Sequence, residues 1–220
     1  MECNCSKYDP EKIRCRIDNI LKNETESSDL HYAKVCVLFV RIHNGDWEDN
    51  WRSSVFSRVY ECFITECLNV ISANKWCLNV YVASACVWGV YDGDTVEKRD
   101  SVVKTAAEVM KIVEFLNESF EAKGYSKVLM GLGIEYGEGL MVNSNYSSCI
   151  DDNIVWGGGN TRKAFKLCCL AGKDNFLPVA VGESFYKELS KDMKKLFNVN
   201  YCGKDRKIYC ATLELLTKTE

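Results

Sequence analysis

Residues 128–167 constrain the fold more than any other part of the chain. From 128 to 142 apolar residues alternate with small ones: Met130, Leu132 and Ile134 alternate with Gly131 and Gly133. In a strand, one face then packs and the other lets a neighbour approach the backbone closely. We expect two strands here, joined as a β-hairpin at residues 137–139. A run of glycines at 157–159 then leads into a helix that we place at about 161–171.

Hydrophobic spacing elsewhere predicts alternating helices and strands. The apolar run at 34–42 is typical of a central strand. Apolar residues at intervals of three and four predict helices at 51–72 and from Thr95 or Asp100 to Gly124. Shorter patterns predict a helix at about 184–196 and strands at 77–84, 87–91, 177–181, 199–202 and 207–213. The opening order β-α-β-β-α-β is ferredoxin-like, so we predict an α/β (α+β) fold.

Length and composition suit one globular domain with a short extension. The chain has 220 residues, of which 47% are hydrophobic, enough to bury a core. A net charge of -3 without a basic block gives no reason to expect binding to nucleic acid or to a membrane. No apolar run approaches the roughly 18 to 20 residues that span a bilayer, and no signal sequence is present. We expect an N-terminal helical extension at 1–30, a domain at 31–220, and a cytoplasmic protein.

The cysteines favour free thiols. There are 13 of them, an odd number, and most lie in apolar segments, which is typical of buried thiols in a reduced compartment. Cys3 and Cys5 form one close pair outside such segments. With only two histidines in the chain, the spacing of a four-ligand zinc site is missing. We therefore expect no zinc.

Three segments resemble the catalytic domain of class III nucleotide cyclases, in the right order and at sensible distances. They are residues 37–42, 82–91 and 128–168, so the resemblance covers about residues 34–170. The chain looks most like the bacterial Pycsar anti-phage cyclases, which make cyclic pyrimidine mononucleotides. The resemblance implies a ferredoxin-like core elaborated as a cyclase domain, a head-to-tail homodimer, and a nucleoside triphosphate or cyclic nucleotide as ligand.

The resemblance also implies where the chemistry lies. Such cyclases hold two Mg²⁺ ions on two aspartates of one subunit, while an Asn and an Arg or Lys of the other subunit steady the transition state. Here the aspartate positions fall on Arg41 and Ala85, with Ser84 where the family has Gly. The Asn position falls on Arg162, and Lys166 fits the cationic position. We therefore expect no metal ligand at these positions, and Mg²⁺ or Mn²⁺ as cofactor only if the protein is active.

Arg41 has two alternative interpretations. A guanidinium pairs bidentately with phosphate oxygens, so Arg41 with Arg162 or Lys166 across a dimer can bind a nucleotide without metal. Alternatively, Arg41 pairs with Glu135 on the adjacent strand and has no further role. Other carboxylates near the aspartate positions are interpreted as loop and capping residues: Asp46, Glu48, Asp49, Asp92 and Asp94.

Further candidate nucleotide contacts precede the helix at 161–171. They are Trp156, Gly158, Gly159 and Asn160, because a glycine run permits close approach of the backbone to a phosphate. Asn160 also takes the Asn position if the turn is shifted by two residues. Three strand aromatics either stack on a base or belong to the core: Tyr81, Trp88 and Tyr91.

Three functions remain open. The first is a cyclase homologue with a disabled two-metal site, acting as a dimeric nucleotide-binding or regulatory protein in bacterial anti-phage defence. The second is an active pyrimidine cyclase that makes cCMP or cUMP from CTP or UTP. The third is a ferredoxin-like scaffold unrelated to cyclases. We favour the first, because both carboxylates are replaced and an arginine repels Mg²⁺ at close range.

Overall fold

The computed structural model describes residues 11, 14, 30–43, 54–143, 154–173, 176–202, 206–212 and 214. Most of the helix predicted in the N-terminal extension lies outside these residues, so the division of the chain at residue 30 stays a prediction. Among the described residues, no helix has the length and apolar character needed to cross a membrane.

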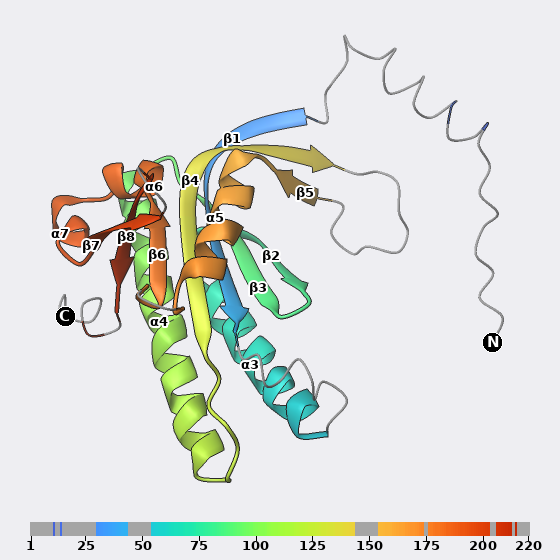
Figure 1. Cartoon of the computed structure of the whole chain (residues 1–220). Helices are drawn as coiled ribbons and strands as arrows, with labels where there is room; N and C mark the ends of the chain where they lie inside the picture. The colour runs from blue at the N-terminus through green and yellow to red at the C-terminus, as the bar shows by residue number, and fades with distance from the viewer. Residues whose placement is uncertain are drawn as a thin grey trace.

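One sheet of eight strands runs through the molecule (Figure 1). Its strands are β1 (Leu30–Ile42), β2 (Cys77–Ala83), β3 (Cys86–Asp92), β4 (Met130–Asn143), β5 (Ile154–Gly157), β6 (Val179–Gly182), β7 (Asn198–Cys202) and β8 (Arg206–Ala211). Their order is β2-β3-β1-β4-β6-β8-β7, and β5 pairs with β4. The neighbours among β1 to β4 are antiparallel, in the ferredoxin-like order. The predicted fold class is therefore confirmed.

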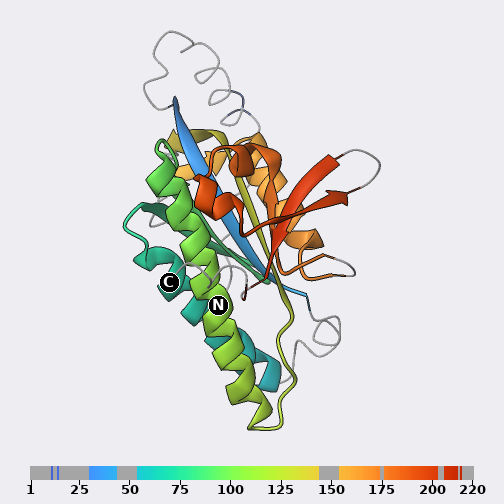
Figure 2. The ribbon, with the colours of Figure 1, turned by 90° about the vertical axis from the view of Figure 1, so that its left-hand side faces the viewer.

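Helices cover both faces of this sheet (Figures 1 and 2). The helices are α3 (Ser54–Ala73), α4 (Val96–Glu121), α5 (Gly159–Leu170), α6 (Glu183–Lys187) and α7 (Lys191–Lys194). Residues of α3 and α4 pack on one face, whereas α5 packs on the other. Two short helices replace the single helix predicted at 184–196, because Ser190 caps a new helix by accepting a hydrogen bond from Met193 N.

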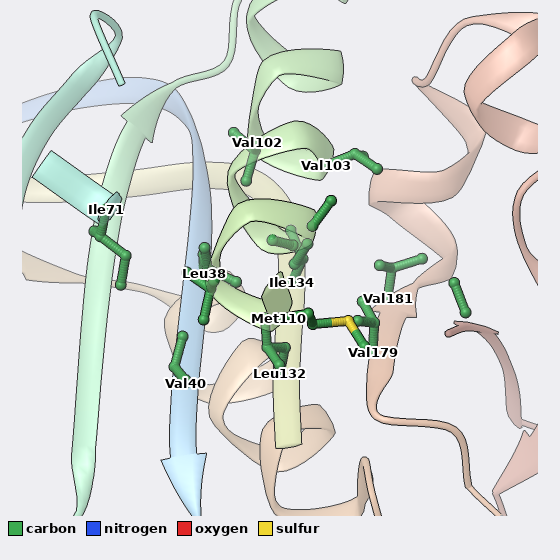
Figure 3. Packing of buried hydrophobic residues seen from close by; sticks show 14 of the residues in the cluster. Leu38, Val40, Ile71, Val102, Val103, Met110, Leu132, Ile134, Val179 and Val181 are labelled. Carbon is green, nitrogen blue, oxygen red and sulfur yellow. The ribbon is translucent and has the colours of Figure 1, made fainter. Parts of the chain in front are cut away.

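The larger core lies between the sheet and the pair α3 and α4. Leu38 of β1 and Ile134 of β4 meet Val102 and Met110 of α4 there, with Ile71 from α3 in the same cluster (Figure 3). Each fully buried aliphatic side chain contributes about 1.5–3 kcal/mol to stability. This core fixes the strands on which the candidate site lies.

The β-hairpin predicted within residues 128–142 is wrong. β4 runs through Gly137 and Gly139 as one strand of 14 residues, paired with β1 along its length. Glycine is needed at 139 for space, since a Cβ there would lie 2.7 Å from Cγ2 of Val35. At Gly133 a Cβ would overlap the carbonyl oxygen of Ala164 in α5. The predicted alternation of faces is confirmed, and the element that approaches the backbone is α5.

Candidate functional site

Arg41 lies near the end of β1 in the middle of the sheet. Its register partners are Cys86 of β3 and Gly131 of β4. Its Nη1 donates a hydrogen bond to Sγ of Cys169 in α5 at 3.1 Å, and its Cζ lies 6.0 Å from the centre of the Phe165 ring. Its Nε is buried and has no hydrogen-bond partner among the described residues. Arg41 therefore carries a part-buried positive charge with an N–H group still to satisfy.

Three thiols, of Cys86, Cys168 and Cys169, lie near this guanidinium. Burial raises the pKa of both Cys86 and Cys168, so neither thiol ionises near neutral pH. Burial works to lower the pKa of Arg41, but the contact with Cys169 and the nearby thiols outweigh it, and the pKa of Arg41 is raised. The positive charge of Arg41 is thus permanent.

His43 follows Arg41 on the same face of β1. Its Nε2 lies 2.9 Å from the carbonyl oxygen of Ala171. Because a carbonyl only accepts, Nε2 carries the hydrogen, which leaves the buried Nδ1 as an acceptor without a partner among the described residues. Burial, followed by the charge of Lys173, lowers the pKa of His43. His43 is therefore neutral near pH 7.

The alternative pairing of Arg41 with Glu135 is not what the structure shows. Glu135 lies opposite Val37, four residues along β1 from Arg41. Its Oε1 accepts a hydrogen bond from Phe185 N at 3.2 Å, and Gly182 leaves room for the carboxylate, because a Cβ at 182 would overlap it. Glu135 is thus anchored at α6, and Arg41 is held by Cys169 instead.

The turn between β2 and β3 places Ala85 beside the end of β1. Ile42 N donates a hydrogen bond to Ala85 O at 3.1 Å, so the two positions that we predict to align with the cyclase aspartates, Arg41 on β1 and Ala85 in the turn before β3, lie close together. Ser84 has φ 53°, the left-handed conformation that glycine adopts most easily. The backbone of this turn therefore suits a glycine at position 84, the residue that the cyclase resemblance implies there.

The residues at these two positions do not fit a divalent metal. Mg²⁺ takes oxygen ligands, whereas the side chain of Ala85 offers none, its carbonyl oxygen accepts a hydrogen bond from Ile42 N, and Arg41 places a positive charge there. In the described ranges, no group of three His, Cys, Asp or Glu residues is arranged to hold a metal ion. Asp92 and Asp94 bind Lys98 at 2.6 and 2.8 Å. Both carboxylates thus form ion pairs at the far end of β3, the end at which they were predicted to lie. The other three carboxylates, Asp46, Glu48 and Asp49, lie outside the described residues.

Arg162 and Lys166 lie one turn apart on the exposed face of α5. Both line a pocket of about 270 Å³ beside the helix. The other lining residues are Glu135, Lys163, Gly182, Glu183, Ser184 and Lys207. The structure thus brings the two predicted transition-state positions together, while Arg41 lies near the opposite end of α5, beside Cys169.

Asn160 and Trp156 make internal contacts. Asn160 is buried, and its Nδ2 donates to Gly137 O at 3.3 Å. Trp156 is 7% exposed, and its Nε1 donates to Oδ1 of Asn79 at 2.7 Å. Asn160 thus joins α5 to β4, and Trp156 joins β5 to β2. A role for them as ligand contacts stays a prediction.

The glycines before α5 differ in their surroundings. Gly158 has φ 139° and a Cβ there would lie 2.8 Å from Oδ1 of Asn160, so this position requires glycine. At Gly157 and Gly159 a Cβ would meet nothing within 4 Å. The backbone at the start of α5 is therefore open to a ligand on one side.

The strand aromatics stack on one another. Tyr81 stacks on Trp88 with ring centres 4.3 Å apart, and Trp88 stacks on Phe39 at 5.0 Å. Tyr91 is fully buried on the other face and donates its hydroxyl to Ile71 O. Tyr91 thus belongs to the core, while Tyr81 and Trp88 form a half-exposed aromatic surface on the same side of the sheet as α5.

Comparison with known proteins gives relatives in sequence and in fold, although no family model matches the chain. A uridylate cyclase of Treponema porcinum is 23% identical over 218 residues, covering 92% of this chain and 76% of that protein. A uridylate cyclase of Gulbenkiania mobilis is 24% identical over 199 residues, covering 79% and 76%. The adenylyl cyclase CyaB from Pseudomonas aeruginosa matches the fold with a TM-score of 0.65 at 14% identity, covering 83% of this chain and 95% of that one. The chain has a class III nucleotide cyclase domain fold.

The resemblance of the chain to class III nucleotide cyclases, close to Pycsar cyclases, is thereby confirmed. The same cyclase fold occurs in a class III adenylyl cyclase-like ATP-binding protein from Pseudomonas aeruginosa, with a TM-score of 0.66 at 18% identity, covering 86% of this chain and 40% of that one.

Sequence reasoning did not identify four residues near the site: Lys163, Phe165, Cys169 and Lys207. Lys163 and Phe165 are exposed on a helix that was predicted, whereas Cys169 of the same helix is part-buried against Arg41. Lys207 carried no signal, because only the folding of β8 beside β6 brings it near α5.

Proposed function

We propose that the protein is a dimeric nucleotide-binding protein that binds a nucleoside triphosphate or cyclic nucleotide without metal ions and does not cyclise it. The observation that carries the proposal is Arg41, a part-buried cation with an unpaired N–H, placed beside Ala85. A guanidinium offers charge and paired donors to phosphate oxygens. It does not lower the pKa of a 3′-hydroxyl as a bound metal ion does.

The dimer of this proposal is head-to-tail. Arg162 and Lys166 of one subunit then face the Arg41 end of the other, as the cyclase resemblance implies. The exposed face of α5 suits such a contact, because Phe165 is 39% exposed between the two cations. Binding without turnover suits a sensor or regulatory subunit, and the likeness to Pycsar cyclases supports such a role in bacterial anti-phage defence.

A thermal-shift series in EDTA tests this function. The series compares UTP, CTP and their cyclic monophosphates. We expect at least one of these ligands to raise the melting temperature of the wild-type protein. Arg41→Ala should abolish that rise, whereas Arg58→Ala, which removes an exposed arginine on α3, should leave it unchanged. A rise that needs Mg²⁺, or that survives Arg41→Ala, would contradict the proposal.

An active pyrimidine cyclase is the second candidate. The observation that favours it is the similarity to two uridylate cyclases over 92% and 79% of the chain. In that case UTP with Mn²⁺ yields cUMP, and the metal ligands are residues other than those at positions 41 and 85. Detection of cUMP or cCMP by mass spectrometry decides between the two candidates.

A further inference from the structure

Cys169 of α5 differs from the other described cysteines in its contact with a positive charge. Its sulfur accepts a hydrogen bond from Nη1 of Arg41 at 3.1 Å. Among the cysteines that the structure describes, no other sulfur accepts a hydrogen bond from a cationic side chain. Cys169 is also part-buried, whereas its neighbours Cys86 and Cys168 are buried. A small reagent in the solvent therefore reaches Cys169 more readily than it reaches the other two thiols near Arg41.

The charge of Arg41 favours oxidation of this sulfur by a peroxide. The sulfur attacks one oxygen of hydrogen peroxide, the O–O bond breaks, and the thiol proton passes to the leaving oxygen, so a thiol and peroxide give a sulfenic acid and water. Negative charge lies first on the sulfur and then on the leaving oxygen, and an adjacent guanidinium stabilises both. At Cys86 and Cys168 burial outweighs the charge of Arg41 and raises the pKa of each thiol.

We propose that Cys169 is a site of reversible oxidation by peroxides, and that its sulfenic acid blocks the binding of phosphate groups at Arg41. The added oxygen places an acceptor beside a guanidinium whose Nε has no partner among the described residues. In its anionic form the oxidised sulfur also pairs with the charge that a phosphate needs. A dithiol reverses the change, because it removes the oxygen as water and becomes a disulfide. The block of binding rests on the proposed function, whereas the oxidation of Cys169 does not.

Trapping with dimedone, which labels sulfenic acids, tests the modification site. The reduced full chain is treated with hydrogen peroxide and dimedone, and peptide mass spectrometry gives the rate of labelling at each cysteine. We expect Cys169 to be labelled about fivefold faster or more than Cys62, an exposed cysteine of α3. Arg41→Met should lower the rate at Cys169 by about fivefold or more and leave the rate at Cys62 unchanged. Equal rates at the two cysteines of the wild type, or an unchanged rate at Cys169 in a folded Arg41→Met variant, would overturn the site.

Calorimetric titration with UTP and CTP in EDTA separates this inference from the proposed function. We expect peroxide to weaken nucleotide binding about tenfold or more and dithiothreitol to restore it. Cys169→Ser should bind without responding to peroxide, since serine keeps an acceptor for Arg41, whereas the matched control Cys62→Ser should respond as the wild type does.

The two claims fail in different ways. If Cys169 is labelled and the reduced protein binds neither nucleotide, the modification site stands and the proposed function fails. If binding depends on Arg41 and peroxide leaves it unchanged, the proposed function stands and the block by Cys169 is overturned.

Discussion

Arg41, Ser84 and Ala85 form one corner of the sheet, at the end of β1 and in the turn between β2 and β3. Ser84 adopts the left-handed conformation of the glycine that the cyclase resemblance places there. Arg41 lies at the aligned aspartate position, and Ala85 O still accepts a hydrogen bond from Ile42 N. This corner thus has a left-handed residue at 84 and no side-chain carboxylate at 41 or 85.

Replacing Ser84 by glycine should stabilise the protein. A left-handed residue with a Cβ costs about 1–2 kcal/mol, and the greater freedom of glycine in the unfolded chain offsets part of the gain. We expect Ser84→Gly to raise the free energy of unfolding by about 0.5–1 kcal/mol in urea titrations. Ser84→Ala keeps the strain and should give no gain. An equal gain in both variants would show that the conformation is not the cause.

Asp92 gives a pH-dependent contribution to stability. Burial opposes ionisation, but hydrogen bonds from Lys98 and from Asp94 N outweigh it, and the pKa of Asp92 is lowered. The contribution is therefore present above the unfolded value of about 3.9 and is lost as pH falls through the lower folded value. We expect Asp92→Asn to cost about 0.5–1 kcal/mol at pH 7, since the pair is partly exposed.

Urea titrations of wild type and Asp92→Asn between pH 7 and pH 3 measure this contribution. The difference in free energy of unfolding between the two proteins should shrink below about pH 4. A difference that stays constant over the whole range would mean that the ionised carboxylate is not its source.

At the scale of elements, β4 and α5 form one unit. The glycines at 131 and 133 let the backbone of α5 lie directly on β4: at Gly131 a Cβ would lie 2.6 Å from Cys168 O, and at Gly133 it would lie 2.9 Å from Cys168 Cα. This contact places Cys169 against Arg41 at one end of α5 and the basic pocket at the other. The geometry of the site therefore depends on two small residues of a strand.

Gly133→Ala should disrupt this unit. The added methyl group would overlap backbone atoms of α5, which cannot move aside as a side chain can, so we expect a loss of about 2–4 kcal/mol. Gly157→Ala is the control, because a Cβ there meets nothing within 4 Å. Thermal unfolding of both variants measures the difference. Similar stabilities would show that α5 does not lie this close to β4.

Most elements of the fold were predictable from hydrophobic periodicity, but β5, the break between α6 and α7, and the path of β4 through its glycines were not. The glycines at 137 and 139 are as typical of a turn as of close packing, and only the 13-residue pairing of β1 with β4 distinguishes the two. In the site, Arg162 and Lys166 followed from one helix motif. Lys207 did not, because its place near α5 depends on the order of strands β4, β6 and β8.

At the scale of the whole molecule, the proposed dimer distinguishes the two helical layers, since only one of them forms the interface. Phe165 of α5 is 39% exposed and lies near Arg41 of β1. Phe115 of α4, in the layer on the opposite face of the sheet, is 65% exposed. If the dimer forms through the α5 face, Phe165→Asp should weaken it about tenfold or more by burying a charge. Phe115→Asp should leave it unchanged. Sedimentation equilibrium gives both constants, and the reverse pattern would place the interface on α4.

The central claim is that this cyclase fold binds a nucleotide through Arg41 and leaves it intact. The most direct measurement is to incubate the protein with ATP, GTP, CTP and UTP in Mn²⁺ and in EDTA, and to identify the bound and free nucleotides by mass spectrometry. We expect every triphosphate to be recovered uncyclised, with one class retained in EDTA by wild type but not by Arg41→Ala. Formation of a 3′,5′-cyclic nucleotide would contradict the account.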